Sequence, residues 1–263
     1  MNREPAWVAA IRLAIDLAVE PDDSAIVPAP SFGSYAREVR LQGAEPSFVS
    51  HEEILDADPA DHTLAIVCNP NNPTGTLYAR DELLAFARQC REAGTHLLVD
   101  EAFLGFTEQE SLAGTPGVTV ARSLTKLFGL PGIRAGFAVA AGETREAMLA
   151  ARRPWNVSTP ALATGRYCMR QSGFVTETCC RVRRERQRLR DGLGDRFDVH
   201  PSAAPFLLVD VSDPGVDAVL DTTAEHGVAL RDARTFRGLD NHVRIAVRDR
   251  AATDRMLEVF ADV

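Results

Sequence analysis

The chain has 263 residues, of which 45% are hydrophobic and 25% charged, so it can bury a full core in one large domain or in one large and one smaller domain. Its formal net charge of −8 argues against nucleic acid as a partner, because a polyanion needs a basic surface. No apolar run approaches the ~20 residues that span a bilayer, and the start is no signal peptide, so we expect a cytoplasmic protein with no membrane partner. The cysteines lack metal-ligand spacing, so we expect free thiols and no bound metal.

The first segments are a helix and a strand that lead to an aromatic residue. Apolar side chains recur at helical spacing through residues 5–20, with a proline in the first turn, which predicts an amphipathic helix. Residues 25–27 are predicted to form a buried strand that ends at the prolines of residues 28–30. Phe32 follows, and its ring could stack on a flat heteroaromatic ring, a contact that adds ~0.5–1.5 kcal/mol beyond burial. A plain core aromatic is the alternative.

A second strand leads into a loop rich in asparagine and proline. Residues 63–68 are apolar and fit a strand buried on both faces. The string Asn-Pro-Asn-Asn-Pro-Thr-Gly follows at residues 69–75. Asn72, held extended by the next proline, could direct its amide at a phenolate oxygen, and an ordinary turn is the alternative. A helix is then predicted over residues 79–93, with Gly94 as its stop.

A third strand, predicted at residues 96–99, delivers Asp100 at its carboxyl end. An acidic residue at a strand end is common in α/β proteins, so Asp100 alone is weak evidence for a site. It lies between Asn72 and Lys126 in the chain, and each of the three follows a different predicted strand. We therefore expect these side chains to meet at one edge of a sheet.

Lys126 is the only lysine of the chain and lies between strands predicted at residues 118–123 and 136–140. Lysine can lose its proton and attack a carbonyl, whereas a guanidinium stays charged, so we interpret Lys126 as a Schiff-base lysine. Chance survival on a solvated loop is the alternative. Ser123 and Arg134 flank it, and a hydroxyl and a guanidinium beside an amine suit a phosphate. Strand and helix alternate as far as residue 140, which predicts a largely parallel sheet.

The pattern changes after residue 153. Helices are predicted over residues 143–153, 160–171, 174–193 and 251–261, with a further helix stopped by Gly227, and short strands over residues 206–209, 228–230 and 242–247. We therefore divide the chain into a large domain, residues 1–150, and a small α+β domain, residues 151–263.

The small domain contributes two candidate anion binders. Arg244 alternates with apolar neighbours in its strand, so it points away from the core and could bind a carboxylate with both arms of its guanidinium. A surface ion pair is the alternative. Arg231, placed after the strand at residues 228–230, is the second candidate. Two arginines predict a substrate with two acidic groups.

Together these strings resemble the fold-type I pyridoxal-phosphate-dependent aminotransferase superfamily of classes I and II, through essentially the whole chain. The resemblance implies an α/β fold with a mainly parallel large domain that binds the cofactor, pyridoxal 5'-phosphate (PLP), and a homodimer. It implies that Lys126 carries the cofactor and that Phe32 covers its ring. It also implies that Asp100 keeps the ring nitrogen protonated, which makes the ring an electron sink.

The same resemblance assigns the remaining polar residues. Ser123 and Arg134 would bind the cofactor phosphate, and Asn72 its phenolic oxygen. Arg244 would bind the substrate carboxylate. Phe103 departs from the commoner aminotransferase pattern, which has a tyrosine at this position, and this leaves Asn72 as the main polar partner of the phenolic oxygen.

Within the superfamily, the strings Asp-Glu-Ala-Phe, Ser-Leu-Thr-Lys and Pro-Trp-Asn-Val-Ser look most like the threonine-phosphate decarboxylases of cobalamin biosynthesis, with histidinol-phosphate aminotransferases as near neighbours. The resemblance implies loss of carbon dioxide from L-threonine O-3-phosphate, a small phosphorylated amino acid, to give (R)-1-amino-2-propanol O-phosphate. Family members carry a further N-terminal segment with a glycine-rich phosphate-binding turn, which we expect to be missing here, either because the start is misassigned or because the chain is a truncated relative. A truncated, catalytically inactive binding module with this fold is the alternative of another class.

Overall fold

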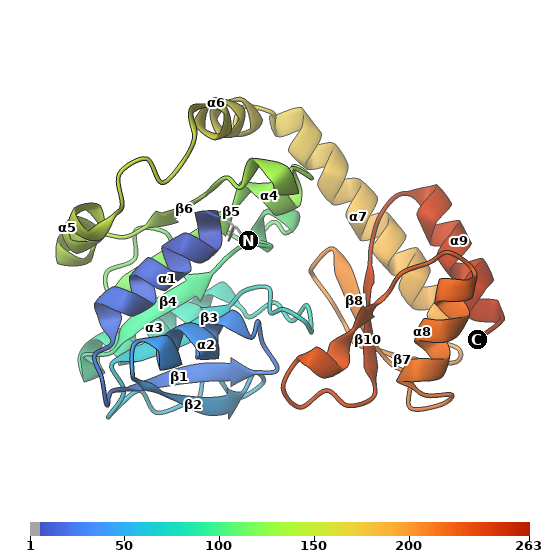
Figure 1. Cartoon of the computed structure of the whole chain (residues 1–263), viewed down its shortest axis with the longest axis horizontal. Helices are drawn as coiled ribbons and strands as arrows, with labels where there is room; N and C mark the ends of the chain where they lie inside the picture. The colour runs from blue at the N-terminus through green and yellow to red at the C-terminus, as the bar shows by residue number, and fades with distance from the viewer. Residues whose placement is uncertain (1–5) are drawn as a thin grey trace.

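The computed structural model describes residues 6–263, which form two β-sheets connected by a long helix (Figure 1). The larger sheet has six strands in the order β2-β1-β3-β4-β5-β6, and the smaller has four in the order β7-β8-β10-β9. Residue 5, where the first helix was predicted to begin, lies outside the described residues.

The large sheet is mainly parallel, as predicted. Its strands are β1 (Ser24–Ala29), β2 (Glu45–Ser50), β3 (Leu64–Cys68), β4 (His96–Asp100), β5 (Val118–Ser123) and β6 (Gly136–Val139), and the helices beside it are α1 (Ala6–Ala18), α2 (Ser34–Leu41) and α3 (Arg80–Ala93). Strands β1 to β5 run parallel, and β6 is antiparallel to β5. The sequence analysis missed β2, because Pro46 and two serines interrupt its apolar pattern.

Strand β1 continues through Pro28 instead of ending at residue 27. Its neighbour β3 pairs only with Ala25 and Ile26, so beyond residue 26 the strand is paired on the β2 side alone. A proline is tolerated where one side of a strand has no ladder to complete.

Alternate residues of the large sheet pack on opposite faces, as strand geometry requires. Ile66 and Leu98 belong to the hydrophobic cluster that contains the buried side chains of α1 and α2. Val67 and Val99, one residue further along each strand, belong to a second cluster with α3. Helix α3 ends at Gly94, which adopts a left-handed conformation with φ 81°.

The segment between the sheets is helical. It contains α5 (Gly142–Ala151), α6 (Thr159–Cys168) and α7 (Ser172–Leu193), whereas the short helices η1 (Leu104–Phe106), α4 (Leu124–Leu127) and η2 (Pro131–Ile133) lie between strands of the large sheet. None of the residues of α5 is buried, and Figure 1 shows α6 at the top edge of the molecule, apart from both sheets. We call residues 142–174 the helical arm.

The small sheet is antiparallel. It contains β7 (Asp198–Val199), β8 (Phe206–Asp210), β9 (Arg231–Asp232) and β10 (His242–Ala246), with η3 (Ala233–Thr235), α8 (Val216–Glu225) and α9 (Arg250–Ala261) around it. The strand predicted at residues 228–230 is wrong. Val228 donates its backbone N–H to Thr223 and so closes the end of α8, and pairing with β10 begins only at Arg231.

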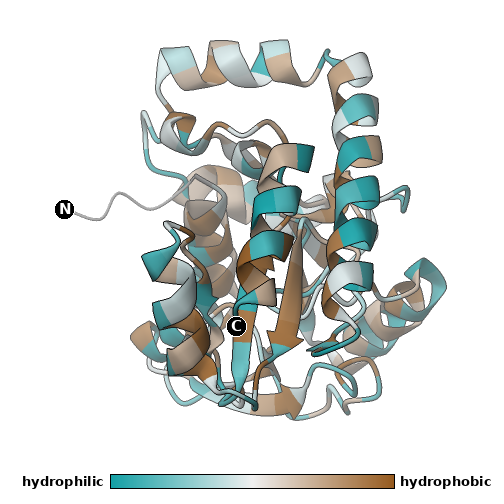
Figure 2. Ribbon diagram, turned by 90° about the vertical axis from the view of Figure 1, so that its right-hand side faces the viewer, coloured by the Kyte–Doolittle hydropathy of each residue, from teal (hydrophilic) through white to brown (hydrophobic). Residues whose placement is uncertain are grey.

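Colouring by hydropathy shows brown along the strands and teal on the outward faces of the helices (Figure 2). Within residues 6–263, no helix combines the length and the apolar character that crossing a bilayer requires. The loop after β3 ties the two sheets together, because Ala203 donates its backbone N–H to the Gly75 carbonyl at 2.8 Å.

Candidate active site

The predicted site residues of the large sheet lie at one edge. Strands β3, β4 and β5 are parallel neighbours, so their carboxyl ends bring the Asn72 loop, Asp100 and Lys126 to the same side. Cys68 and Asp100, the last residues of β3 and β4, stand directly opposite each other. This edge faces the small sheet in Figure 1.

Asp100 is 2% exposed and accepts hydrogen bonds on both carboxylate oxygens. Trp7 Nε1 donates to Oδ1 and Oδ2 at 3.2 and 3.1 Å. Tyr35 Oη donates to Oδ2 at 2.6 Å, and the Ala102 backbone N–H donates to Oδ1 at 2.9 Å. Burial raises the pKa of Asp100, while these donors and the Lys126 ammonium act in the opposite direction. A ring N–H is therefore already bonded to this carboxylate.

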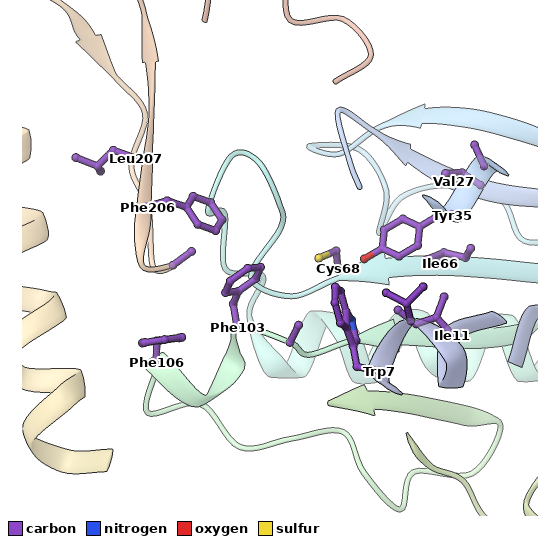
Figure 3. Packing of buried hydrophobic residues seen from close by; sticks show 14 of the residues in the cluster. Trp7, Ile11, Val27, Tyr35, Ile66, Cys68, Phe103, Phe106, Phe206 and Leu207 are labelled. Carbon is purple, nitrogen blue, oxygen red and sulfur yellow. The ribbon is translucent and has the colours of Figure 1, made fainter. Parts of the chain in front are cut away.

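The Trp7 indole lies flat against Phe32. Their ring centroids are 5.7 Å apart and their planes differ by 27°, which is a stacked arrangement. Figure 3 shows the Trp7 ring beside Cys68, with the Tyr35 hydroxyl pointing toward it and Phe103 on the side of the small sheet. Phe32 thus stacks on a heteroaromatic ring, and that ring belongs to the chain itself.

Lys126 lies on the short helix α4, with its Nζ between two aromatic rings. Nζ is 5.0 Å from the Trp7 ring centroid and 5.6 Å from that of Phe103. Burial and the nearby Arg244 and Arg134 guanidinium groups lower the pKa of Lys126, and the Asp100 carboxylate raises it. The net shift increases the share of neutral amine, the form that attacks a carbonyl.

Ser123 and Arg134 frame the loop that contains Lys126. Ser123 caps α4 by accepting the Thr125 backbone N–H at 3.3 Å, and the two hydroxyls of these residues lie 2.9 Å apart. Arg134 has a left-handed backbone with φ 57° and donates from Nη1 to the Pro131 carbonyl at 3.1 Å. The loop therefore places hydroxyl and guanidinium donors on both sides of the lysine.

Arg244 reaches from the small sheet to the large one. Its Nη1 donates to Asn72 Oδ1, and its guanidinium lies 4.8 Å from the Phe206 ring centroid. Burial, followed by the charge of Arg231, lowers the pKa of Arg244 to about 10. Because Asn72 Oδ1 is engaged, the amide presents its Nδ2 group to the other side.

Arg231 stands directly opposite Arg244 across β9 and β10. Both guanidinium groups lie near the Phe236 ring, at 5.9 and 5.7 Å from its centroid. Arg231 is exposed and donates to Thr235 Oγ1 at 2.9 Å. Among residues 6–263, no ion pair with a carboxylate is formed by either guanidinium. Two like charges held together in this way suit an anionic ligand.

Two residues of this site were missed in the sequence analysis, Trp7 and Tyr35. Trp7 precedes the buried positions 8, 11 and 15 of α1, so helical periodicity could have placed it on the buried face. Its contact with Asp100, 93 residues later, had no local signal. Tyr35 lies three residues after Phe32, in the first turn of α2, and its bond to Asp100 spans 65 residues.

The site residues fit PLP. A pyridinium ring needs a carboxylate for its N–H and an aromatic face to stack on, and the indole of Trp7 finds both in Asp100 and Phe32. An aldehyde needs a deprotonated amine within reach, which Lys126 supplies. The place for the ring therefore accepts a flat N–H heterocycle, and in this structure Trp7 is that heterocycle.

Comparison with known proteins agrees with this chemistry. The family described as aminotransferase class I and II matches residues 7–260. The chain is 31% identical over 258 residues to histidinol-phosphate aminotransferase 2 of Archaeoglobus fulgidus, covering 93% of this chain and 72% of that protein. It is 29% identical over 257 residues to threonine-phosphate decarboxylase of Salmonella typhimurium, covering 91% and 70%.

A solved structure extends the comparison to the fold. Histidinol-phosphate aminotransferase of Sinorhizobium meliloti, in complex with PLP, superimposes with a TM-score of 0.85 at 23% identity, covering 96% of this chain and 74% of that one. The predicted fold type I and the predicted cofactor are confirmed. The chain belongs to the class I and II aminotransferase family and is a PLP-dependent enzyme of fold type I.

Proposed function

We propose that the enzyme decarboxylates L-threonine O-3-phosphate to (R)-1-amino-2-propanol O-phosphate in cobalamin biosynthesis. The observation that carries this proposal is the cross-strand pair of Arg231 and Arg244 above the Phe236 ring. Threonine phosphate carries a carboxylate and a phosphate, so it offers one anion to each guanidinium. The relative from Salmonella typhimurium with this activity supports the same assignment.

In this proposal the large sheet holds the cofactor. Lys126 would bind it covalently, Phe32 would stack on its ring and Asn72 Nδ2 would donate to its phenolic oxygen. Asp100 would hold a proton on the ring nitrogen. When bound, PLP supplies an electron sink for the bond that breaks at the substrate Cα. Ser123 and Arg134 bind its phosphate.

The other groups orient the substrate and move the proton. Arg244 and Arg231 would bind the two substrate anions and so fix the orientation of the substrate carboxylate. When carbon dioxide leaves, the Lys126 ammonium delivers a proton to Cα in its place. Phe103 has no hydroxyl and packs edge to face on Phe206 with ring centroids 5.1 Å apart, so it excludes water beside the lysine.

Transamination of histidinol phosphate is the second candidate, favoured by the relative from Archaeoglobus fulgidus. The amino acceptor 2-oxoglutarate also has two carboxylates, so the arginine pair alone does not separate the two reactions. Decarboxylation needs one substrate and no acceptor. We therefore expect carbon dioxide from threonine phosphate without any keto acid.

The test compares both substrates with the same preparation. Release of carbon dioxide from threonine phosphate alone supports the proposal. Rapid transamination of histidinol phosphate with 2-oxoglutarate, without carbon dioxide from threonine phosphate, would move the assignment to the second candidate. PLP-loaded protein that turns over neither substrate contradicts both and favours the inactive binding module.

We also propose that the enzyme is a homodimer that pairs through the helical arm. The arm exposes large apolar side chains, which are Leu149, Trp155, Leu162, Tyr167, Met169 and Phe174. An exposed apolar surface of this kind marks a protein contact. Sedimentation should give a dimer that Leu162→Arg converts to monomer, while Leu41→Arg, exposed on α2, leaves the dimer intact. A stable monomer with bound cofactor would contradict the proposal.

The division of the chain into two domains is proposed on the positions of the sheets. All strands of the large sheet fall within residues 1–150, and all strands of the small sheet within residues 151–263. Limited proteolysis in the helical arm should release the large part with its PLP site intact. Cleavage that starts inside the large sheet would contradict this boundary.

A further inference from the structure

We propose that Trp7 is a resident occupant of the cofactor-ring site, so that the cofactor-free protein is closed by its own indole and PLP enters by displacing it. The inference concerns uptake of the cofactor and does not depend on which substrate the enzyme uses. In this proposal the Trp7 indole and the pyridine ring of PLP bind in the same place and cannot be there together.

Three contacts define the place that Trp7 occupies. Its ring stacks on Phe32 at 5.7 Å, its N–H is shared by the two oxygens of Asp100, and the Lys126 Nζ lies 5.0 Å from its centroid. A pyridinium ring bound through its N–H to Asp100, with its aldehyde at Lys126, requires the same three partners. Two rings cannot share these partners at once, because stacking and hydrogen bonding fix both the plane and the in-plane direction of the ring.

The site is closed well by the indole. Trp7 is 6% exposed and leaves both Asp100 oxygens with donors, so the buried carboxylate has partners without any ligand. Gly136 on β6 makes room for this placement, since a Cβ there would lie 2.7 Å from the Trp7 Cβ and its backbone nitrogen. Trp7 is therefore held by contacts from strands β4 and β6, from Lys126 on α4 and from Phe32.

The position of Trp7 in α1 also allows it to leave. It lies in the first turn, where backbone N–H groups have no intrahelical acceptor, so turning this residue outward breaks few helical bonds. Ile11 and Ile15 are fully buried further along α1 and keep the helix on the sheet. The displacement therefore requires movement of one turn and not of the helix.

The consequence is a lowered apparent affinity for PLP. Only molecules with Trp7 turned out can bind the ring, so the measured dissociation constant is the intrinsic one divided by the open fraction. Removing the indole should raise the rate of cofactor uptake and lower the stability of the cofactor-free protein. The cofactor-bound protein should lose little, because Trp7 no longer contributes there.

Intrinsic fluorescence tests the displacement directly. The chain has two tryptophans, and Trp155 is 97% exposed. In a Trp155→Phe background Trp7 is the sole indole, and we expect blue-shifted emission that acrylamide barely quenches. Binding of PLP should shift the emission maximum to the red and raise acrylamide quenching several-fold. Trp7→Phe protein, which retains Trp155, controls for direct quenching by the cofactor and should show no shift.

Uptake kinetics give the second measurement, with cofactor trapped on Lys126 by borohydride and counted by mass. Trp7→Ala should take up PLP about tenfold faster than the parent protein. Val8→Ala is the matched control. Val8 is the next buried residue of α1, but its aliphatic side chain can neither donate a hydrogen bond to Asp100 nor stack as a ring on Phe32. Uptake by Trp7→Ala with none by the parent also supports the proposal.

Three results would overturn it. One is blue, unquenchable Trp7 emission in fully cofactor-loaded protein. Another is equal loss of stability in Trp7→Ala with and without PLP, which indicates an ordinary core residue. The third is failure of both the parent and Trp7→Ala to take up cofactor, because removing the indole should open the site.

Discussion

The two halves of the site differ in whether their charged groups already have suitable partners within the chain. On the large sheet, the buried charge of Asp100 receives hydrogen bonds from Trp7, Tyr35 and a backbone N–H. On the small sheet, Arg231 and Arg244 face each other as like charges and donate to the neutral oxygens of Thr235 and Asn72. The charged group of the cofactor half thus has its partners without a ligand, whereas the arginines of the anion half gain an opposite charge only when a ligand binds. Cofactor binding is an exchange of partners, and substrate binding supplies a missing charge.

The largest expected effect comes from Lys126, the reactive amine of the cofactor half. Lys126→Ala removes the only lysine, so borohydride should trap no cofactor and turnover should fall on the order of 10⁴-fold or more. Absorbance of bound PLP and kcat measure the two effects. A visible cofactor band that survives this substitution would show that another group binds the aldehyde.

The anion half should respond next. Arg244→Ala removes a guanidinium that a bound anion would pair with in a closed site. The loss of transition-state stabilisation, measured by kcat/KM, should be on the order of 2–5 kcal/mol. Arg231→Ala should cost less, because Arg231 is exposed and solvent screens its charge. Cofactor affinity should change little in Arg231→Ala, because Arg231 contacts neither Asn72 nor Lys126 in the structure. Equal losses from both substitutions would contradict the difference in burial.

The cofactor half is tested by removing one donor. Tyr35→Phe leaves the buried Asp100 without the bond from Tyr35 Oη, which costs ~1.5–3 kcal/mol for a charged acceptor. Tyr78→Phe is the matched control, because Tyr78 Oη donates to the neutral His51 carbonyl. Losing that hydrogen bond should cost ~0.5–1.5 kcal/mol of unfolding free energy. Urea unfolding of cofactor-free protein measures both. A smaller loss in Tyr35→Phe than in Tyr78→Phe would mean that Asp100 is protonated.

The smallest effect is a titration shift. Burial and Arg244 lower the pKa of Lys126 below the ordinary 10.5, so the folded state binds fewer protons than the unfolded state between the lowered value and 10.5. Stability contributed by this group therefore rises with pH through that window. Reductive methylation with isotope-labelled formaldehyde labels Lys126 alone among the side chains, and NMR follows its titration. Arg244→Gln should move the pKa upward, and a downward move would contradict the assigned cause.

The sequence predicts the sheet edge better than it predicts the ring site. Asn72, Asp100 and Lys126 each follow an apolar run, and parallel strands end at the same edge, so their proximity could be inferred. The alternation of Arg244 with buried Val243 and Ile245 likewise predicted its direction. These inferences rest on local periodicity.

The ring site depends on long-range contacts that no local pattern encodes. The bond from Trp7 to Asp100 joins an α1 residue to a strand end 93 residues away. The displaced strand β9 has a different cause, since the end of α8 takes the backbone N–H that a strand at residue 228 would need. In both cases a partner elsewhere in the chain decides the structure.

Because the chain has one lysine, a protease that cleaves after lysine has a single target in the whole protein, and it lies in the candidate active site. A lysine whose amine is covalently bound to the cofactor is no longer a substrate for such a protease. The ratio of intact to cleaved chain in a denaturing gel, after borohydride treatment and digestion, therefore reports the fraction of molecules that carry the cofactor. For amine-directed dyes and cross-linkers Lys126 is likewise the one side-chain amine, so it offers a defined point for attaching a probe next to the reaction.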